Sequence, residues 1–168
     1  QLLSAAAQGQ LLTSEGLQEQ ARRLMNGEGF FDSLESFHRD LFHTYRLKDF
    51  SFDENIINDN TKLAMGSEIR RYLHLLDRYE MLNFAGLFGA SRYEVIPELA
   101  HLYGLDSMTG DSMEVQSSER RGLLGLPSVL AATSAKQGEN PTLARSVFIL
   151  EAILCQSLPS FPGDLDTS

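Results

Sequence analysis

The stretch from Asn58 to Tyr79, NDNTKLAMGSEIRRYLHLLDRY, decides the fold of this chain. Its apolar side chains recur every three or four residues, which places them on one face of a helix. That face carries Met65, Ile69, Tyr72, Leu73, Leu76 and Tyr79. The opposite face carries Arg70, Arg71, His74, Asp77 and Arg78. The pattern predicts a core-facing helix over this stretch, although Gly66 lies inside it.

Further helices are predicted on the N-terminal side. Thr13 or Ser14 suits a helix cap, and the helix that follows is expected to end near Met25. A second helix is predicted from Phe30, because apolar residues then recur at helical spacing. They are Phe30, Leu34, Phe37, Leu41 and Tyr45.

On the C-terminal side, short helices are predicted over residues 83–90 and 127–132, and a longer one from Tyr93 to Tyr103 that Gly104 stops. The segment 141–155 begins with Pro141 at a first helical position and is apolar almost all round. It is therefore predicted to be the central buried helix. There, Phe148→Ala should lower the free energy of unfolding by about 3–5 kcal/mol.

These patterns predict an all-α fold: one irregular bundle of about six to seven helices with a long polar loop near residues 106–120. No polar and apolar alternation persists, and no hairpin turn joins two β-branched runs. The chain is expected to be one module over residues 1–168, with sub-modules at 1–105 and 121–162. A chain of 168 residues suits one domain.

Composition narrows the classes of function. The chain has 14 Lys and Arg against 23 Asp and Glu, a net charge of −9, which disfavours nucleic-acid binding. No apolar run approaches the roughly 18 residues of a membrane-spanning helix, so membrane insertion is not expected. The single cysteine, Cys155, has no partner for an internal disulfide and is interpreted as a small core residue.

His38 is the first candidate for a binding role, because it lies beside the apolar face of the helix predicted from Phe30. A haem or a metal ion uses such an imidazole as a ligand. The favoured interpretation is a half-buried ring that is hydrogen-bonded to a backbone carbonyl, since one histidine is no coordination set. No metal site and no resident cofactor are predicted in this chain.

Three polar residues near the C-terminus are further candidates: Arg121, Ser134 and Arg145. Ser134 lies near Lys136, a pair that serves as nucleophile and base in some hydrolases, but a serine that caps the end of a helix is favoured. Arg145 is the one charge on an otherwise apolar helix and needs a partner, either Glu151 or a carbonyl of the preceding loop. No catalytic residue is predicted.

An oxygen-rich segment covers Asp53, Glu54, Asn55, Asn58 and Asp59. Calcium takes several carboxylate and amide oxygens, but the glycine of the usual calcium loop is missing here. Helix capping and solvation are the favoured explanation.

The C-terminal quarter supports a resemblance. Residues 121–162 read RGLLGLPSVLAATSAKQGENPTLARSVFILEAILCQSLPSFP, and residues 2–25 read LLSAAAQGQLLTSEGLQEQARRLM. In order and spacing they resemble uncharacterised helical domains found upstream of the c-type cytochrome segment in large extracytoplasmic proteins of planctomycetes and myxobacteria. Where that family often has consecutive prolines, this chain reads SLPSFP.

The resemblance implies that the chain is a piece of a longer secreted polypeptide whose neighbouring domains are its partners. It also implies haem c in the full-length parent and an extracytoplasmic location. The first hypothesis is a non-catalytic helical domain that docks or positions the neighbouring cytochrome segment. The alternatives are part of an enzyme or carbohydrate-handling protein whose site is completed by flanking domains, and a plain interaction module with an exposed apolar patch.

Overall fold

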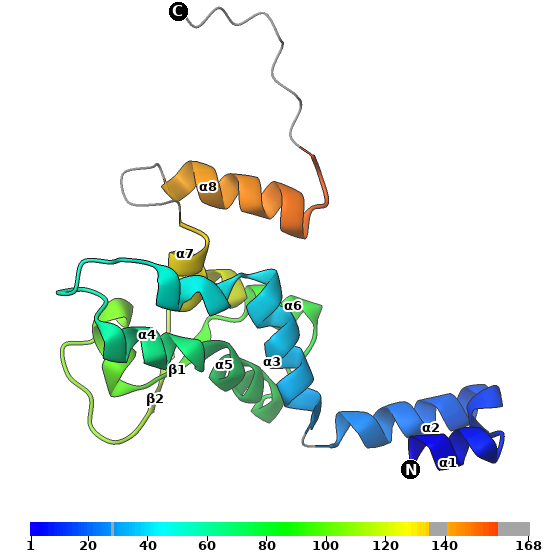
Figure 1. Ribbon diagram of the computed structural model, residues 1–168. Helices are drawn as coiled ribbons and strands as arrows, with labels where there is room; N and C mark the ends of the chain where they lie inside the picture. The colour runs from blue at the N-terminus through cyan, green and yellow to red at the C-terminus, as the bar shows by residue number, and fades with distance from the viewer. Residues whose placement is uncertain (28, 135–140, 158–168) are drawn as a thin grey trace, which may run out of the picture.

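The computed structural model describes residues 1–27, 29–134 and 141–157 (Figure 1). This part of the chain is mostly α-helical and contains one two-stranded antiparallel sheet. The prediction of a mostly helical fold is therefore confirmed, and the prediction of a purely helical one is wrong. No helix in the described part is long and apolar enough to cross a membrane.

The regular elements follow one another with short connections. The α-helices are α1 (Leu2–Ala7), α2 (Ser14–Met25), α3 (Gly29–Leu41), α4 (Asp59–Gly66), α5 (Glu68–Arg78), α6 (Phe84–Gly89), α7 (Pro127–Ala132) and α8 (Pro141–Phe148). The strands are β1 (Arg92–Val95) and β2 (Met113–Gln116). Four 3-10 helices lie between them, at Gln10–Leu12, Thr44–Asp49, Pro97–Tyr103 and Leu123–Gly125, and a π-helical turn at Ile149–Ile153 follows α8.

Helix α5 lies at the centre of the core. Its buried apolar side chains are Ile69, Tyr72, Leu73, Leu75 and Leu76, and α3 packs beside it (Figure 1). The core also takes Leu99 from one predicted sub-module and Leu123 and Val129 from the other. Parts of both predicted sub-modules, from residues 31–105 and 121–134, thus contribute to one core.

The helix predicted across residues 58–79 is divided at Ser67. Helix α4 ends at Gly66 and α5 begins at Glu68. At the end of α4, Ala64 O accepts from the backbone N of Ser67 at 3.3 Å, from Ser67 Oγ at 3.2 Å and from Arg71 Nη2 at 3.1 Å. Glycine weakens the helix at this point, and these two side chains stabilise its end.

The buried face of α3 differs from the predicted stripe. The helix ends at Leu41, and Phe37, which was placed on the core face, is 60% exposed. The side chains that reach the core are those of Phe31, Leu34, His38 and Leu41. The inward face is therefore rotated relative to the predicted one.

The sheet lies where a helix and a loop were predicted. Strand β1 begins the segment that was predicted as a helix from Tyr93 to Tyr103, and β2 lies inside the predicted polar loop. Tyr93 pairs with Val115, and the side chains of Tyr93 and Val95 are buried. Pro97 keeps the preceding residue extended, so no helix runs through residues 93–96; a 3-10 helix begins at Pro97, and Gly104 ends it as predicted with φ 74°.

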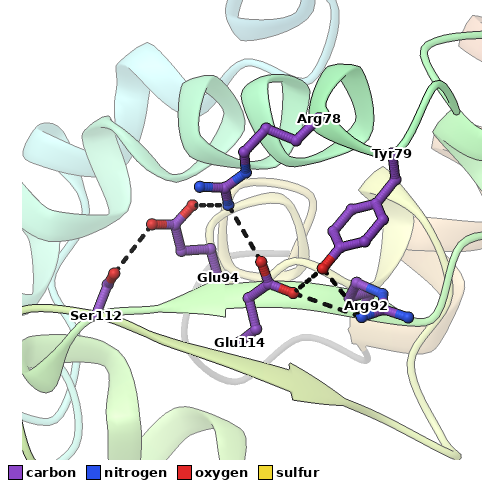
Figure 2. Close-up of polar contacts among 6 residues, drawn as sticks. All are labelled: Arg78, Tyr79, Arg92, Glu94, Ser112 and Glu114. Atoms are coloured by element: carbon purple, nitrogen blue, oxygen red, sulfur yellow. Dashed lines mark hydrogen bonds and ion pairs between the residues drawn. The ribbon is translucent and has the colours of Figure 1, made fainter.

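A polar network joins this sheet to the end of α5 (Figure 2). Arg78 Nη2 lies 2.7 Å from Glu94 Oε2 and 3.5 Å from Glu114 Oε1. The Tyr79 hydroxyl donates to Glu114 Oε2 at 2.7 Å, and the Arg92 guanidinium lies 4.4 Å from the centre of the Tyr79 ring. Tyr79 was predicted on the apolar face of α5, but it is 43% exposed because it belongs to this network.

Helix α8 is peripheral, whereas the sequence predicted it to be central. None of the side chains of α8 or of the π-helical turn is buried. Phe148 is half-buried, with its ring 5.9 Å from that of Phe42 and 6.4 Å from that of His43. Cys155, interpreted as a core residue, is exposed.

The N-terminal residues 2–25 form a helical hairpin, here called the arm, that projects from the body (Figure 1). Thr13 caps α2 as predicted, since its Oγ1 accepts from Gly16 N at 3.1 Å. Ala5 is the one buried side chain among residues 1–27. The large apolar side chains of the arm are exposed: Leu2, Leu3, Leu12, Leu17, Leu24 and Met25.

Candidate functional site

A cleft of about 990 Å³ lies between residues 46–57, α7 and the start of α8. Its apolar lining includes Phe50, Phe52, Ile57, Met65, Leu102, Leu130 and Ala131. Its charged and hydroxyl groups are those of Arg46, Asp49, Ser51, Asp53, Arg120, Ser134 and Arg145. An apolar cavity with a few polar groups is the usual form of a small-molecule site.

The guanidinium of Arg120 is held in a fixed position in this cleft. Its Nη1 donates to Gly125 O at 2.9 Å and its Nη2 to Leu102 O at 2.7 Å. The guanidinium also lies 5.3 Å from the centre of the Tyr103 ring. Two carbonyls and one aromatic face therefore fix the cation without neutralising it.

Arg145 and Ser134 meet on the neighbouring wall. Arg145 Nη2 donates to Ser134 Oγ at 2.9 Å and to Leu130 O at 3.1 Å. Ser134 Oγ donates in turn to Leu130 O at 2.7 Å, which confirms its predicted role at a helix end. The arginine thus ties α8 to the last turn of α7. Its Nε is buried and has no hydrogen-bond partner in the described part of the chain.

The buried carboxylate of Glu68 binds two residues next to those that line the cleft. Glu68 Oε1 accepts from the Tyr103 hydroxyl and Oε2 from Ser128 N, both at 2.8 Å. Burial raises the pKa of Glu68 above its ordinary value, and the hydrogen bonds from Ser128 and Tyr103 and the charge of Arg71 oppose this rise. Glu68 therefore connects α5 to the start of α7 and to the tyrosine beneath Arg120.

The structure brings together two of the four candidate residues, Ser134 and Arg145. Arg121 is exposed and does not line the cleft, because its Nη1 donates to the carbonyls of Ser117 and Arg120, both at 2.8 Å. The guanidinium that does line the cleft belongs to the adjacent Arg120. The Arg120-Arg121 pair was the available signal, but sequence alone gives no means of telling which of the two side chains turns inward.

His38 lies away from the cleft. Its Nδ1 is 2.7 Å from the Leu34 carbonyl, which is the favoured interpretation from the sequence. Burial lowers the pKa of His38, and the hydrogen bond to Leu34 opposes this shift. The ring lies 5.1 Å from that of Phe37 and 6.3 Å from that of Phe42. These contacts explain the histidine as part of the packing of α3.

The oxygen-rich segment is used for capping, as the favoured interpretation held. Asn58 Oδ1 accepts from Thr61 N at 3.0 Å at the start of α4, and Asp53 Oδ1 accepts from Asn55 N at 3.0 Å. Within the described residues, no group of three or more histidine, cysteine or acidic side chains is placed to hold a metal ion. Lys136, the predicted neighbour of Ser134, lies outside those residues.

The fold defines a mostly α-helical domain with a small two-stranded sheet and, among the described residues, a cleft lined by Arg46, Arg120 and Arg145. The family model described as "PSD4: Protein of unknown function (DUF1592)" matches residues 1–105, and the chain belongs to this family. The matched part contains the arm, α3 to α6, β1 and the segment that forms one wall of the cleft. No curated protein and no solved structure matches the chain significantly.

Proposed function

We propose that this domain is a non-catalytic docking module of a longer secreted polypeptide and that it positions a neighbouring c-type cytochrome segment of that polypeptide. The observation that carries the proposal is the group of exposed apolar side chains on the arm. Leu12 is 88% exposed and Leu3 is 87% exposed, although both lie on ordered helical turns. The identity of the partner rests on the family resemblance of residues 121–162.

The arm has the form of a recognition element. Its helix α2 carries Glu15, Glu19 and Arg22 on the surface together with the exposed Leu17 and the other apolar side chains. Isolated helices of this length are marginal in water, and most of their stability comes from packing an apolar face. A partner that covers this face stabilises the arm and gains affinity from the same burial.

The test is to add the neighbouring segment in trans to residues 1–168 and to measure the melting temperature. Binding to the folded state raises that temperature by an amount that grows with the logarithm of the ligand excess. The variant Leu12→Ser should lose this rise. Leu63→Ser is the matched control, because Leu63 is 80% exposed but lies on α4, outside the arm. No rise at high excess contradicts the docking proposal.

The cytochrome part of the proposal has its own measurement. A visible absorption spectrum with a pyridine haemochrome assay is recorded on the full-length parent and on residues 1–168. We expect haem in the parent and none in the fragment. A parent without haem contradicts the cytochrome assignment while leaving docking of another neighbour open to the melting assay.

A second candidate function, part of an enzyme or carbohydrate-handling protein, is favoured by the contact between Ser134 and Arg145 in a cleft of this size. In that case flanking domains complete the site. Turnover of an ester or a glycoside by the parent protein, lost in Ser134→Ala without a change in the circular dichroism spectrum, supports this function. Equal turnover by the variant excludes a reactive role for Ser134.

A further inference from the structure

The charge of the cleft differs in sign from that of the whole chain. Among the described residues, three arginines and two aspartates line it, which gives this part of the lining a net charge of +1, whereas the whole chain has a net charge of −9. None of the ion pairs among the described residues involves Arg46, Arg120 or Arg145. In an acidic protein, three arginines that gather in one cavity without an acidic partner indicate a site for an anion.

The arginines retain hydrogen-bond donors for a ligand. The side chain of Arg46 makes no hydrogen bond within the described part of the chain, and its guanidinium lies 5.4 Å from the centre of the Phe50 ring. Arg120 and Arg145 donate to backbone carbonyls, and Arg145 also to the Ser134 hydroxyl. Each guanidinium has five N–H groups, so others remain for a ligand. The carbonyls fix the orientation of these two cations, which reduces the ordering needed when an anion binds.

Two aspartates limit the charge that the cleft accepts. Asp53 Oδ1 is occupied by Asn55 N and Asn55 Nδ2, each at 3.0 Å, and Asp49 is exposed at the rim. Their negative charge disfavours a dianion such as a phosphate monoester and is compatible with one carboxylate. The aromatic and aliphatic lining then requires an apolar body attached to that carboxylate.

We propose that this cleft binds a small amphipathic monocarboxylate, with its carboxylate at the arginines and its apolar body against Phe50, Phe52, Ile57 and Leu102. The volume of about 990 Å³ is at the upper end of the roughly 300–1,000 Å³ typical of small-molecule sites, so a long-chain or polycyclic body fits it. This site is separate from the arm, and its ligand is independent of the docking function proposed above.

The experiment is a fluorescence titration of residues 1–168 with cis-parinarate, a carboxylate whose polyene chain fluoresces when it is buried. We expect saturable one-to-one binding, displacement by dodecanoate and no displacement by inorganic phosphate. The neutral methyl ester should bind at least about tenfold more weakly, since it lacks the charge-assisted hydrogen bonds. Equal binding of acid and ester, or displacement by phosphate, overturns the proposal.

Two variants test whether the probe binds in the cleft. Arg46→Gln should weaken binding by about tenfold and leave folding intact, because Arg46 holds no carbonyl. Its matched control is Arg22→Gln, an exposed arginine on the arm near the exposed leucines. Weakening in Arg22→Gln instead of Arg46→Gln places the probe on the arm and contradicts the cleft site.

A third variant tests the cavity itself. Ala131→Trp fills the cleft from α7 and should abolish binding, with circular dichroism and thermal unfolding used to confirm that the variant folds. Unchanged affinity in a folded Ala131→Trp protein rules out the cleft as the binding site.

Discussion

Helices α5 and α8 show what an apolar sequence does and does not say about burial. The segment that contains α8 has apolar residues almost all round, yet none of its described side chains is buried. Helix α5 has charged residues on one side and buries six side chains, Glu68 among them. An amphipathic pattern shows which face of a helix packs against the core. A helix that is apolar on all sides gives no such indication.

The surroundings of the two helices explain the difference. Helix α5 has α3, α4, α6 and β1 as neighbours, so it is packed against elements that precede it and elements that follow it in the sequence. Helix α8 lies outside the body beside α7 (Figure 1). It is attached through Arg145 and through the contact of Phe148 with Phe42.

Truncation at the centre of α5 should give the largest effect. Leu73 has no exposed surface, so Leu73→Ala leaves a cavity and should lower the free energy of unfolding by about 2–5 kcal/mol. Urea unfolding followed by circular dichroism measures it. Leu63→Ala is the matched control because that side chain is 80% exposed, and it should change the value very little. A loss below about 1 kcal/mol for Leu73→Ala contradicts the central position of α5.

Local signals in the sequence account for the elements that were predicted correctly. Thr13 and Asn83 cap α2 and α6 through the N–H of Gly16 and Gly86, and Gly104 ends its 3-10 helix. Capping depends on residues three or four apart, so the sequence contains the whole interaction.

The features that were missed depend on distant residues. Strand β1 has four residues, too few to show a period of two, and its partner β2 lies 18 residues further along, beyond a 3-10 helix and a loop. The division between α4 and α5 is an exception, because the side chains that bind the carbonyl of Ala64 are only three and seven residues away; it was missed because the apolar pattern continues through it. The cleft is also non-local, since its arginines come from positions 46, 120 and 145.

The buried carboxylate of α5 should give the next largest effect. Glu68→Gln replaces one of the two carboxyl oxygens by an amide nitrogen, so either Tyr103 OH or Ser128 N loses its acceptor, at a cost of about 1–3 kcal/mol. Burial raises the pKa of Glu68 above its ordinary 4.5, so the folded protein retains a proton that the unfolded chain releases. The stability that this carboxyl contributes is therefore present below about pH 4.5 and is lost as the pH rises toward the folded pKa.

The direction of the Glu68 pKa shift predicts how the effect of the variant on the free energy of unfolding changes with pH. From pH 4 to pH 7, the free energy of unfolding of Glu68→Gln should rise relative to that of the unmodified protein, because the variant lacks the titration. Urea unfolding at four pH values measures the difference. Glu98→Gln is the control, since it makes the same substitution at an exposed position on the 3-10 helix at Pro97–Tyr103. The opposite slope would mean that the Glu68 carboxylate is stabilised, not penalised, by its surroundings.

Truncation on α8 should cost less than the 3–5 kcal/mol predicted for a central helix. Phe148 is half-buried and contacts the rings of Phe42 and His43, so Phe148→Ala should lower the free energy of unfolding by about 1–2 kcal/mol. The same urea assay compares it directly with Leu73→Ala. A loss equal to that of Leu73→Ala would mean that α8 belongs to the core as α5 does.

The smallest effect is expected at the C-terminal end of α5, where the polar network holds the sheet (Figure 2). Arg78 is 52% exposed and Glu94 is 18% exposed, so solvent screens their 2.7 Å contact. A double-mutant cycle of Arg78→Gln and Glu94→Gln should give a coupling of about 0.2–1 kcal/mol at low salt. The coupling should shrink in 1 M NaCl, where the screening length is about 3 Å.

The exposed Arg39 of α3 supplies the matched control, because Arg39→Gln removes the same charge without touching the network. Pairing it with Glu94→Gln should give no coupling. A coupling for Arg78 that persists in 1 M NaCl would indicate a contact shielded from solvent, and the sheet would then be held on α5 by a buried pair. A coupling of zero at low salt would leave the attachment to the buried side chains of Tyr93 and Val95, which contact the same core as α5.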